Sequence, residues 1–331
     1  MEHKKYFMRL ITLDDFLDTY SKVSQRGYSF FLSKFTFNKN SRAISAFDES
    51  YGETSNWWII PAVQKRWSKM ICGDENVEYK DYFMKKFFDG KSDLKLLSLG
   101  AGECAHEIEL GTYSNFSEVT CVDINQANLD LGKKNADEKG LKNMKFLNAD
   151  VNKYDLPQDY YDVVFFSHSL HHFEAVEKLL EQKIKPCLKP GGKLIIHEFV
   201  GSTRHQFPRE QIVAVNRAIR LIDKKYRTRY KTSLTKNNYY GPGLLRMIIA
   251  DPSECVDSAS ILPAIYKNFE VVEEKPYGGN ILASALKEIA HHFVKENPEK
   301  KKILQDLFDF EDAFLKENQS DYIFGVYEKI I

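Results

Sequence analysis

The sequence predicts an α/β fold built on a mostly parallel sheet, with a helical region at its N-terminal end and helical insertions further along. Two observations carry this prediction. From about Leu94 to Val200, short apolar runs alternate with segments of helical periodicity, a pattern typical of parallel sheets. The first of these runs ends in a glycine turn that leads into a helix, Gly100-Ala-Gly-Glu-Cys-Ala105.

The glycine turn and an acid that follows it predict a binding site for a nucleotide-type cofactor. Glycines at 100 and 102 let the backbone approach a ligand closely, and the start of a helix offers unbonded N–H groups. The next apolar run, Val119–Val122, ends in Asp123, where a carboxylate can accept hydrogen bonds from ribose hydroxyls. On the turn alone a dehydrogenase remains an alternative, because Gly100, Gly102 and Ala105 also satisfy G-x-G-x-x-G/A.

Three later segments favour a different class of enzyme. A third strand, Met144–Leu147, leads to Asp150, and a fourth, Tyr161–Phe166, runs into Ser167-His-Ser-Leu-His-His-Phe173. A Lys-Pro-Gly-Gly turn then precedes the fifth strand. In this order the segments resemble class I S-adenosylmethionine (SAM)-dependent methyltransferases. The resemblance implies SAM as cofactor and a Rossmann-like sheet of seven strands with an antiparallel last strand.

The same resemblance implies which residues hold the cofactor. In this family the first glycine loop faces the methionine part, the strand-2 acid holds the ribose, and an Asp after strand 3 meets the adenine amino group. The expected cofactor-binding residues are Gly100, Ala101, Gly102, Glu103, Asp123, Ile124, Asp150, Val151, Ser167 and His168. The chain departs from the family pattern at Cys104, where Gly is usual, and at Ser98, where an acid is common. We expect Cys104 to be a buried small side chain.

Segments outside the cofactor core read mostly as helices. Helical patterns cover parts of 12–90, 204–222, 281–294 and 300–316. The two strands that close the sheet are expected at Phe269–Lys275 and Tyr322–Tyr327. We therefore predict four parts, which are an N-terminal helical cap or substrate region (1–92), the SAM-binding core (93–200), a helical lid (201–268) and a C-terminal part that completes the sheet (269–331).

Composition points to a soluble cytoplasmic enzyme. The 47 basic and 47 acidic residues give no net charge, which provides no bias toward nucleic acid or membrane surfaces. No apolar run approaches the roughly 18 residues that a membrane span needs. The five cysteines are scattered singly, which fits a reducing compartment. The sequence shows no cluster of acids or histidines that would predict a metal site.

Methyl transfer requires an aligned acceptor and removal of its proton, and histidine is the natural base near neutral pH. His168 and His171 lie directly after the fourth strand, and His197 lies near the end of the fifth. These three are the candidate catalytic residues. The plainer alternative is that they cap a helix or pack in the core.

A second resemblance concerns the acceptor. Four segments resemble bacterial methyltransferases found beside enzymes that modify surface polysaccharides: Asn56–Trp67, Glu198–Gln206, Ile249–Glu254 and Pro276–Gly279. It implies methylation of a hydroxyl on a small molecule or a sugar or glycan precursor.

The stretch 217–236 is locally basic, and an anionic acceptor would fit it because Arg binds phosphate and carboxylate bidentately. The alternative is a solvated helix face. The predicted substrate-binding residues are Arg204, Arg227, Arg229, Tyr239 and Tyr240.

Other functions remain open at this stage. N-methylation is one, and nucleic-acid methylation is another, although the neutral charge and the lack of an Asn/Asp-Pro-Pro-Tyr/Phe motif after strand 4 disfavour the latter. A catalytically silent SAM-binding partner subunit is a third, to which Cys104 and Ser98 give slight support. A homodimer is compatible with the sequence.

Overall fold

The computed structural model describes residues 8–26 and 55–330, and the chain folds into two units. The sheet unit comprises Val77–Val200, Cys255–Lys275 and Ile323–Ile331. The helical unit comprises Met1–Asn76, Gly201–Glu254 and Pro276–Tyr322. The structure thus groups residues 77–92 and 255–268 with the sheet, whereas the domain boundaries at 92, 200 and 268 stay a prediction.

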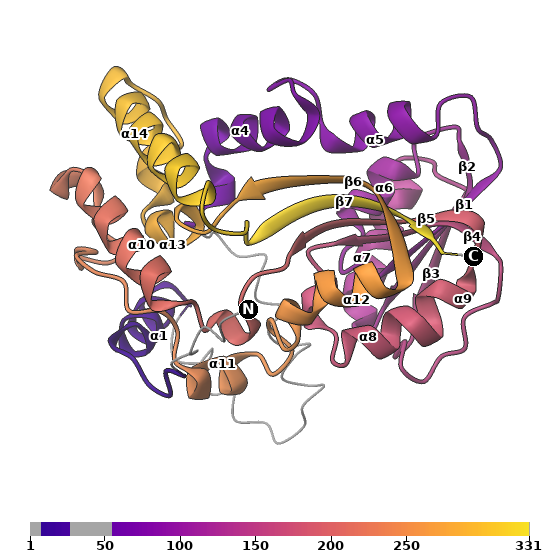
Figure 1. Ribbon diagram of the computed structural model, residues 1–331, viewed down its shortest axis with the longest axis horizontal. Coiled ribbons are helices and arrows are strands. Elements are labelled where there is room, and N and C mark those ends of the chain that lie inside the picture. Colours follow the sequence, from indigo (N-terminus) through magenta and orange to yellow (C-terminus); the bar gives the residue numbers. More distant parts are fainter. Residues whose placement is uncertain (1–7, 27–54, 331) are drawn as a thin grey trace. The chain divides into compact units, whose positions relative to one another are not determined.

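Seven strands form one mixed sheet in the order β3-β2-β1-β4-β5-β7-β6 (Figure 1). They are β1 (Leu94–Leu99), β2 (Phe116–Asp123), β3 (Met144–Asn148), β4 (Tyr161–Ser167), β5 (Leu188–Phe199), β6 (Phe269–Gly278) and β7 (Tyr322–Lys329). Strands β1 to β5 pair in parallel, and the last strand is antiparallel. The predicted mostly parallel, Rossmann-like sheet of seven strands with an antiparallel last strand is therefore confirmed.

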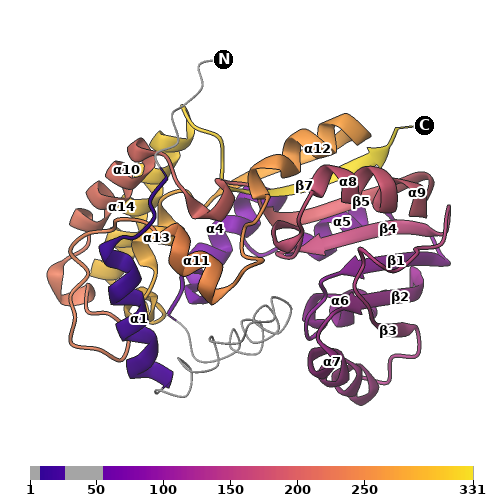
Figure 2. The same cartoon turned by 90° about the horizontal axis from the view of Figure 1, so that it is seen from below.

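Helices cover both faces of the central strands β1 and β4, whose residues are buried almost throughout. The helices of the sheet unit are α5 (Tyr79–Phe87), α6 (Ala105–Leu110), α7 (Gln126–Glu138), η2 (Leu170–His172), α8 (Val176–Leu179), the π-helix η3 (Leu180–Ile184), α9 (Lys185–Cys187), η6 (Ser258–Ser260) and α12 (Ile261–Asn268). Helices α8 and α12 lie side by side in both views (Figures 1 and 2) and cover Val164 and Phe166 of β4. On the other face Phe83 of α5 stacks on Phe324 of β7, with ring centroids 6.2 Å apart.

The helical unit gathers segments that are far apart in sequence. Its helices are α1 (Leu13–Arg26), η1 (Trp57–Ile59), α4 (Pro61–Cys72), η4 (Thr203–His205), α10 (Arg209–Leu221), η5 (Lys224–Tyr226), α11 (Leu244–Ala250), α13 (Leu282–Leu286), η7 (Ala290–Phe293) and α14 (Pro298–Leu315). Helices α10, α13 and α14 pack together, as Figure 2 also shows. No helix among residues 8–26 and 55–330 is both long and apolar enough to cross a bilayer.

Three expected elements differ in the structure. The Lys-Pro-Gly-Gly segment lies inside β5, where the register against β4 shifts, instead of forming a separate turn. The helix expected from Arg204 starts at Arg209, because Arg204 adopts a left-handed φ of 54°. The helix expected over 281–294 is broken between α13 and η7, where Glu288 has a φ of 65°. Such positive φ values do not fit a right-handed helix.

Candidate functional site

The glycine turn between β1 and α6 is tightly held at the carboxyl edge of the sheet. Gly100 and Gly102 have φ of 68° and 54°, which side chains disfavour. The N–H groups of Gly100 and Ala101 donate to the carbonyl of Val122 at 2.8 and 3.2 Å. A Cβ on Gly100 would lie 3.0 Å from the Cβ of Ser169, so this position also requires glycine for space. The turn therefore lies against the loop that follows β4.

Asp123 ends β2 beside this turn. Its Oδ2 accepts a hydrogen bond from Gly102 N at 2.8 Å, and its Oδ1 accepts one from Asn125 N at 2.8 Å. Burial raises the pKa of Asp123, while these backbone donors act in the opposite direction. A carboxylate has about four lone-pair sites, so the fixed group retains capacity for a ribose hydroxyl. The geometry fits the ribose-binding part of a SAM site.

The predicted adenine-side residues lie next to Asp123. Ala149 N donates to the carbonyl of Asp123 at 3.1 Å, which brings the end of β3 alongside the end of β2. Asp150 follows in a turn, where its Oδ1 accepts a hydrogen bond from Asn152 N at 3.0 Å. Val151 is buried in the core and Ile124 is half-buried. The structure thus brings the strand-1, strand-2 and strand-3 residues of the predicted cofactor site to one edge.

Cys104 occupies a backbone position that favours glycine. Its φ of 58° and ψ of 27° are left-handed, and its side chain is fully buried. The thiol lies 3.5 Å from the carbonyl oxygen of Gly102. A Cβ on Gly132 of α7 would lie 3.0 Å from this sulfur, so a small residue faces it. The departure from the family pattern is therefore accommodated inside the fold.

The loop after β4 is anchored by Glu198 of β5. This carboxylate accepts hydrogen bonds from two loop amides through Oε2, Ser169 N at 2.8 Å and Leu170 N at 2.7 Å. Its Oε1 is hydrogen-bonded to Nδ1 of His171 and to the N–H of Phe199. Glu198 is 0% exposed and His171 is 8% exposed. One buried acid thus fixes both the loop backbone and the ring of a predicted catalytic residue.

The charge of Glu198 is stabilised by these partners. Burial acts to raise the pKa of this carboxyl, but the charge and hydrogen bond of His171, with His168 and the N–H of Phe199, hold it below its usual value. Glu198 is therefore ionised at neutral pH. No role in the site was predicted for Glu198 from the sequence, where it only begins the segment Glu198–Gln206. The sequence signal that could have found it is an acidic residue inside an apolar strand, because a buried carboxylate needs hydrogen-bond or ionic partners.

His197 and His168 have different surroundings from His171. The His197 ring is stacked on Tyr79 of α5 at a centroid distance of 4.5 Å, and the His168 ring lies edge-on to it at 4.6 Å. Burial, with smaller effects of His168 and His106, lowers the pKa of His197 well below its usual value. A base with so low a pKa is weak, so these contacts favour a packing role for His197. His168 is exposed and has a φ of 52°.

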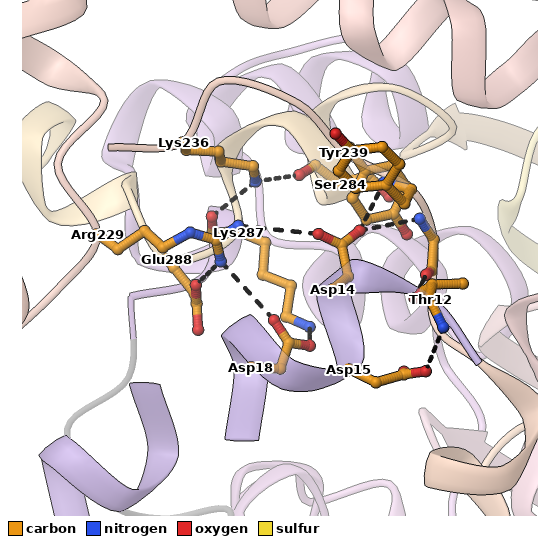
Figure 3. A network of polar contacts seen from close by, with 12 residues as sticks. Thr12, Asp14, Asp15, Asp18, Arg229, Lys236, Tyr239, Ser284, Lys287 and Glu288 are labelled. Atoms are coloured by element: carbon orange, nitrogen blue, oxygen red, sulfur yellow. Dashed lines mark hydrogen bonds and ion pairs between the residues drawn. The ribbon is translucent and has the colours of Figure 1, made fainter. Parts of the chain in front are cut away.

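The predicted substrate-binding residues lie in the helical unit, and two of the arginines have internal partners. Arg204 donates to the carbonyls of Glu254 and Pro252 at 3.0 and 2.6 Å. Arg229 is 4% exposed and pairs with Glu288, with Asp18 at 3.7 Å and with Asp14 at 3.9 Å (Figure 3). Substrate binding by Arg229 would therefore require this ion-pair network to open.

Lys236, another cation of the basic segment, lies in the same network. It is buried and donates to the carbonyls of Ser284 and Lys287 at 2.6 and 2.8 Å (Figure 3). Tyr239 is also buried, whereas Tyr240 is exposed and Arg227 is half-buried. Burial, followed by the charge of Arg229, lowers the pKa of Lys236 to about 7. The basic segment is thus partly an internal structural element instead of a wholly solvated face.

Comparison with known proteins identifies the family. A sequence model described as "Methyltransferase domain" matches residues 90–310. Over 91 residues, 27% of this chain, the sequence is 34% identical to the ubiquinone/menaquinone biosynthesis C-methyltransferase UbiE of Stutzerimonas stutzeri. It is 32% identical over 83 residues, 25% of this chain, to the UbiE protein of Yersinia enterocolitica. The matched part spans about a third of the length of these curated relatives, 35% and 33%.

Solved structures of similar fold include a phosphoethanolamine N-methyltransferase 2 of Haemonchus contortus in complex with SAM. Its TM-score is 0.48 at 13% identity, over 91% of this chain and 59% of that chain. Another is the [4+2]-cyclase SpnF, with a TM-score of 0.45 at 12% identity, over 98% and 100% of the two chains. The family match covers more than half of the sequence and includes the glycine turn, Asp123 and the loop after β4. This chain belongs to the methyltransferase-domain family.

Proposed function

We propose that this enzyme transfers a methyl group to a hydroxyl of a small molecule or of a sugar or glycan precursor, with His171 as general base. The observation that carries the proposal is the hydrogen bond between His171 Nδ1 and the buried carboxylate of Glu198. A histidine held by an ionised carboxylate is the arrangement that removes a proton from a hydroxyl.

The roles of the two residues follow from their contacts. Because Nδ1 is bonded to the carboxylate, it carries the hydrogen, and Nε2 is the ring atom that accepts a proton. The ionised Glu198 stabilises the imidazolium that then forms. Glu198 is itself fixed by the amides of Ser169 and Leu170, so the ring orientation is set by β5 and the loop backbone. SAM supplies an activated methyl group, and the chain supplies alignment and proton removal.

The acceptor class rests on the four segments that resemble methyltransferases of polysaccharide modification. Two of them, Asn56–Trp67 and Pro276–Gly279, meet in an aromatic cluster of the helical unit. Trp57 and Trp67 have ring centroids 4.6 Å apart, and Trp67 and Tyr277 have centroids 5.8 Å apart. An anionic acceptor remains part of the proposal through Arg227 and Tyr240, which are not fully buried.

A carbon acceptor is a second candidate. The curated relatives described above are named as C-methyltransferases, and the similarity extends over 91 residues of this chain. His171 could equally take the proton that a ring carbon loses after methylation. The two candidates differ in the atom that receives the methyl group.

Product analysis tests both candidates. The purified chain is incubated with methyl-¹³C SAM and panels of nucleotide sugars, glycans and phenolic compounds, and NMR identifies whether the label is on oxygen, nitrogen or carbon. An O-methyl product supports the first proposal. A C-methyl product in the phenolic panel alone would replace it with the second, and an N-methyl product would contradict both.

Variants test the base. His171→Gln is expected to lower kcat by roughly 10²- to 10⁴-fold, the range of general-base catalysis, while SAM affinity stays nearly unchanged. Glu198→Gln should lower kcat and alter the pH profile without a matching rise in KM, as expected for a positioning residue. His292→Gln, on η7 in the helical unit, is the control. Equal losses of SAM affinity and turnover in His171→Gln would give that residue a structural role instead.

A further inference from the structure

Helix α1 turns its acidic side chains inward and its large apolar side chains outward. Asp14, Asp15 and Asp18 are all buried. Asp18 pairs with Lys287 at 2.7 Å and with Arg246 at 3.1 Å, and Figure 3 shows α1 directing its acids toward the ion-pair network. The helix is therefore fixed to its own unit by ion pairs instead of by an apolar face, the reverse of a usual surface helix.

The opposite side of α1 presents aromatic and aliphatic side chains. Leu13, Phe16 and Tyr20 are each more than half exposed. Together with the half-buried Val23 they follow the alternating spacing of three and four residues that is typical of the seam between two paired helices. Within residues 13–24, no charged side chain is exposed. A face with this spacing and without charge fits another apolar helix.

The apolar side chains continue beyond the N-terminal end of α1. Met8, Leu10 and Ile11 are also more than half exposed. The carbonyl of Leu10 accepts a hydrogen bond from Leu245 N at 3.2 Å, so the exposed Leu245 of α11 lies beside it. At roughly 100 Å² for a large side chain that is half exposed, these seven residues, the α1 face, offer about 700 Å². A standard interface buries about 800 Å² per partner, so the α1 face has nearly the size that a specific complex needs.

The charges of α1 distinguish between possible partners of this face. A helix that lies on a lipid surface usually carries Lys or Arg on its polar side, where they reach anionic headgroups. In α1 the polar side is acidic and turned into the unit, and Lys22 interacts electrostatically with the buried Asp18. A charged peptide would find no complementary charge among the outward residues. An identical face, by contrast, offers a matching apolar seam and no like-charge repulsion.

We propose that the α1 face binds the same face of a second copy of this chain, so that the enzyme is a homodimer in solution. The contact is isologous, because the same residues come from both copies. Asp14 and Asp15 accept hydrogen bonds from the N–H groups of Tyr240, Gly241 and Gly243. A contact that holds α1 in place therefore also stabilises this loop of the helical unit. The interface does not depend on the acceptor or on the proposed base.

Sedimentation equilibrium of the whole chain tests the proposal, because it measures mass in solution. At micromolar concentration the wild type should have twice the mass of one chain. Phe16→Glu should raise the dissociation constant at least roughly 100-fold, because each copy would bury an unpaired carboxylate in the contact. Val213→Glu, at an exposed apolar position of α10 in the same unit, is the matched control and should stay dimeric. A monomeric wild type, or a Phe16→Glu variant that remains dimeric, would overturn the proposal.

Thermal unfolding keeps the proposal testable if Phe16→Glu does not fold. Association stabilises the folded chain by mass action, so the unfolding midpoint of the wild type should rise with protein concentration. Tyr20→Ser, which removes a ring from the α1 face without adding charge, should reduce this rise, and Val213→Ser should leave it unchanged. A midpoint that does not depend on concentration in the wild type would contradict the proposal.

Vesicles distinguish a lipid surface from a second copy of the chain. Flotation with vesicles of phosphatidylglycerol and phosphatidylcholine should leave the wild type unbound. A monomeric wild type that floats with these vesicles, together with a Phe16→Glu variant that does not, would assign the α1 face to a lipid surface and overturn the proposal. None of these measurements involves turnover, so failure of the dimer is distinguishable from failure of the proposed function.

Discussion

Replacing Arg229 with alanine should destabilise the helical unit strongly. The guanidinium is 4% exposed and is surrounded by Glu288, Asp18 at 3.7 Å and Asp14 at 3.9 Å. At these distances and an effective dielectric constant of about 20, each attraction is worth about 4 kcal/mol before desolvation is subtracted. Removal of the cation would leave three carboxylates buried close together, and breaking a buried pair costs about 3–5 kcal/mol.

The structure places the expected loss near the lower end of that range. Asp18 keeps Lys287 at 2.7 Å and Arg246 at 3.1 Å, and Asp14 keeps two backbone donors, the N–H groups of residues 240 and 241. Glu288 loses the cation that contacts it directly. We therefore expect Arg229→Ala to lower the free energy of unfolding by about 3 kcal/mol.

Tryptophan fluorescence is the appropriate assay. The chain has three tryptophans, Trp57, Trp58 and Trp67, and all belong to the helical unit, so urea titration followed by their emission reports that unit. Arg220→Ala, an exposed arginine on α10, is the control and should change stability by less than about 0.5 kcal/mol. A loss below about 1 kcal/mol in Arg229→Ala would refute the reasoning and leave the two original alternatives, a substrate-binding arginine or a solvated helix face.

Two other predictions concern the glycine turn and a buried acid. Gly100→Ala and Gly140→Ala should each lower the free energy of unfolding by about 1 kcal/mol, because an alanine is strained at φ values of 68° and 69°. Only the Cβ of Gly100→Ala would also crowd Ser169, so only this variant should bind SAM more weakly in calorimetry. Equal SAM affinity in both variants would contradict the close packing of the turn. Burial raises the pKa of Asp321 to about 7, so its contribution to stability is present below pH 4 and is lost as the pH rises toward 7. In the wild type, the unfolding midpoint should therefore fall between pH 4 and pH 7, and Asp321→Asn should remove this fall. The same fall in the variant would show that Asp321 does not cause it.

The strands could be predicted from the sequence because their signals are local. Each combines an apolar run with a turn or a polar residue at its end, as in Val119–Val122 followed by Asp123, and the observed β2 contains this run. The cofactor-side residues follow from the same logic, since the carboxyl ends of parallel strands share one edge of the sheet. The strand order needed the resemblance to a known family, because periodicity does not reveal which strands are neighbours.

What could not be predicted depends on contacts between distant residues. The break between α13 and η7 occurs at Glu288, whose carboxylate pairs with Arg229, 59 residues earlier. The ion pairs of the basic segment could not be predicted because Asp14 and Asp18, the partners of Arg229, lie more than 200 residues before it. Glu198 acquires its role only because β5 lies beside β4 and its loop. Local patterns contain no information on such pairs.

The position of β7 has a consequence for biosynthesis. Although it is the last strand in the sequence, it lies between β5 and β6, so β6 joins the sheet only through it (Figure 1). Until residues 322–329 have emerged from the ribosome, β5 keeps an open edge and β6 has no neighbour in the sheet, and open edges are prone to pair with other chains. The nascent protein should therefore depend on chaperones until β7 has been made, and a premature stop just before Tyr322 would remove two strands from the sheet instead of one.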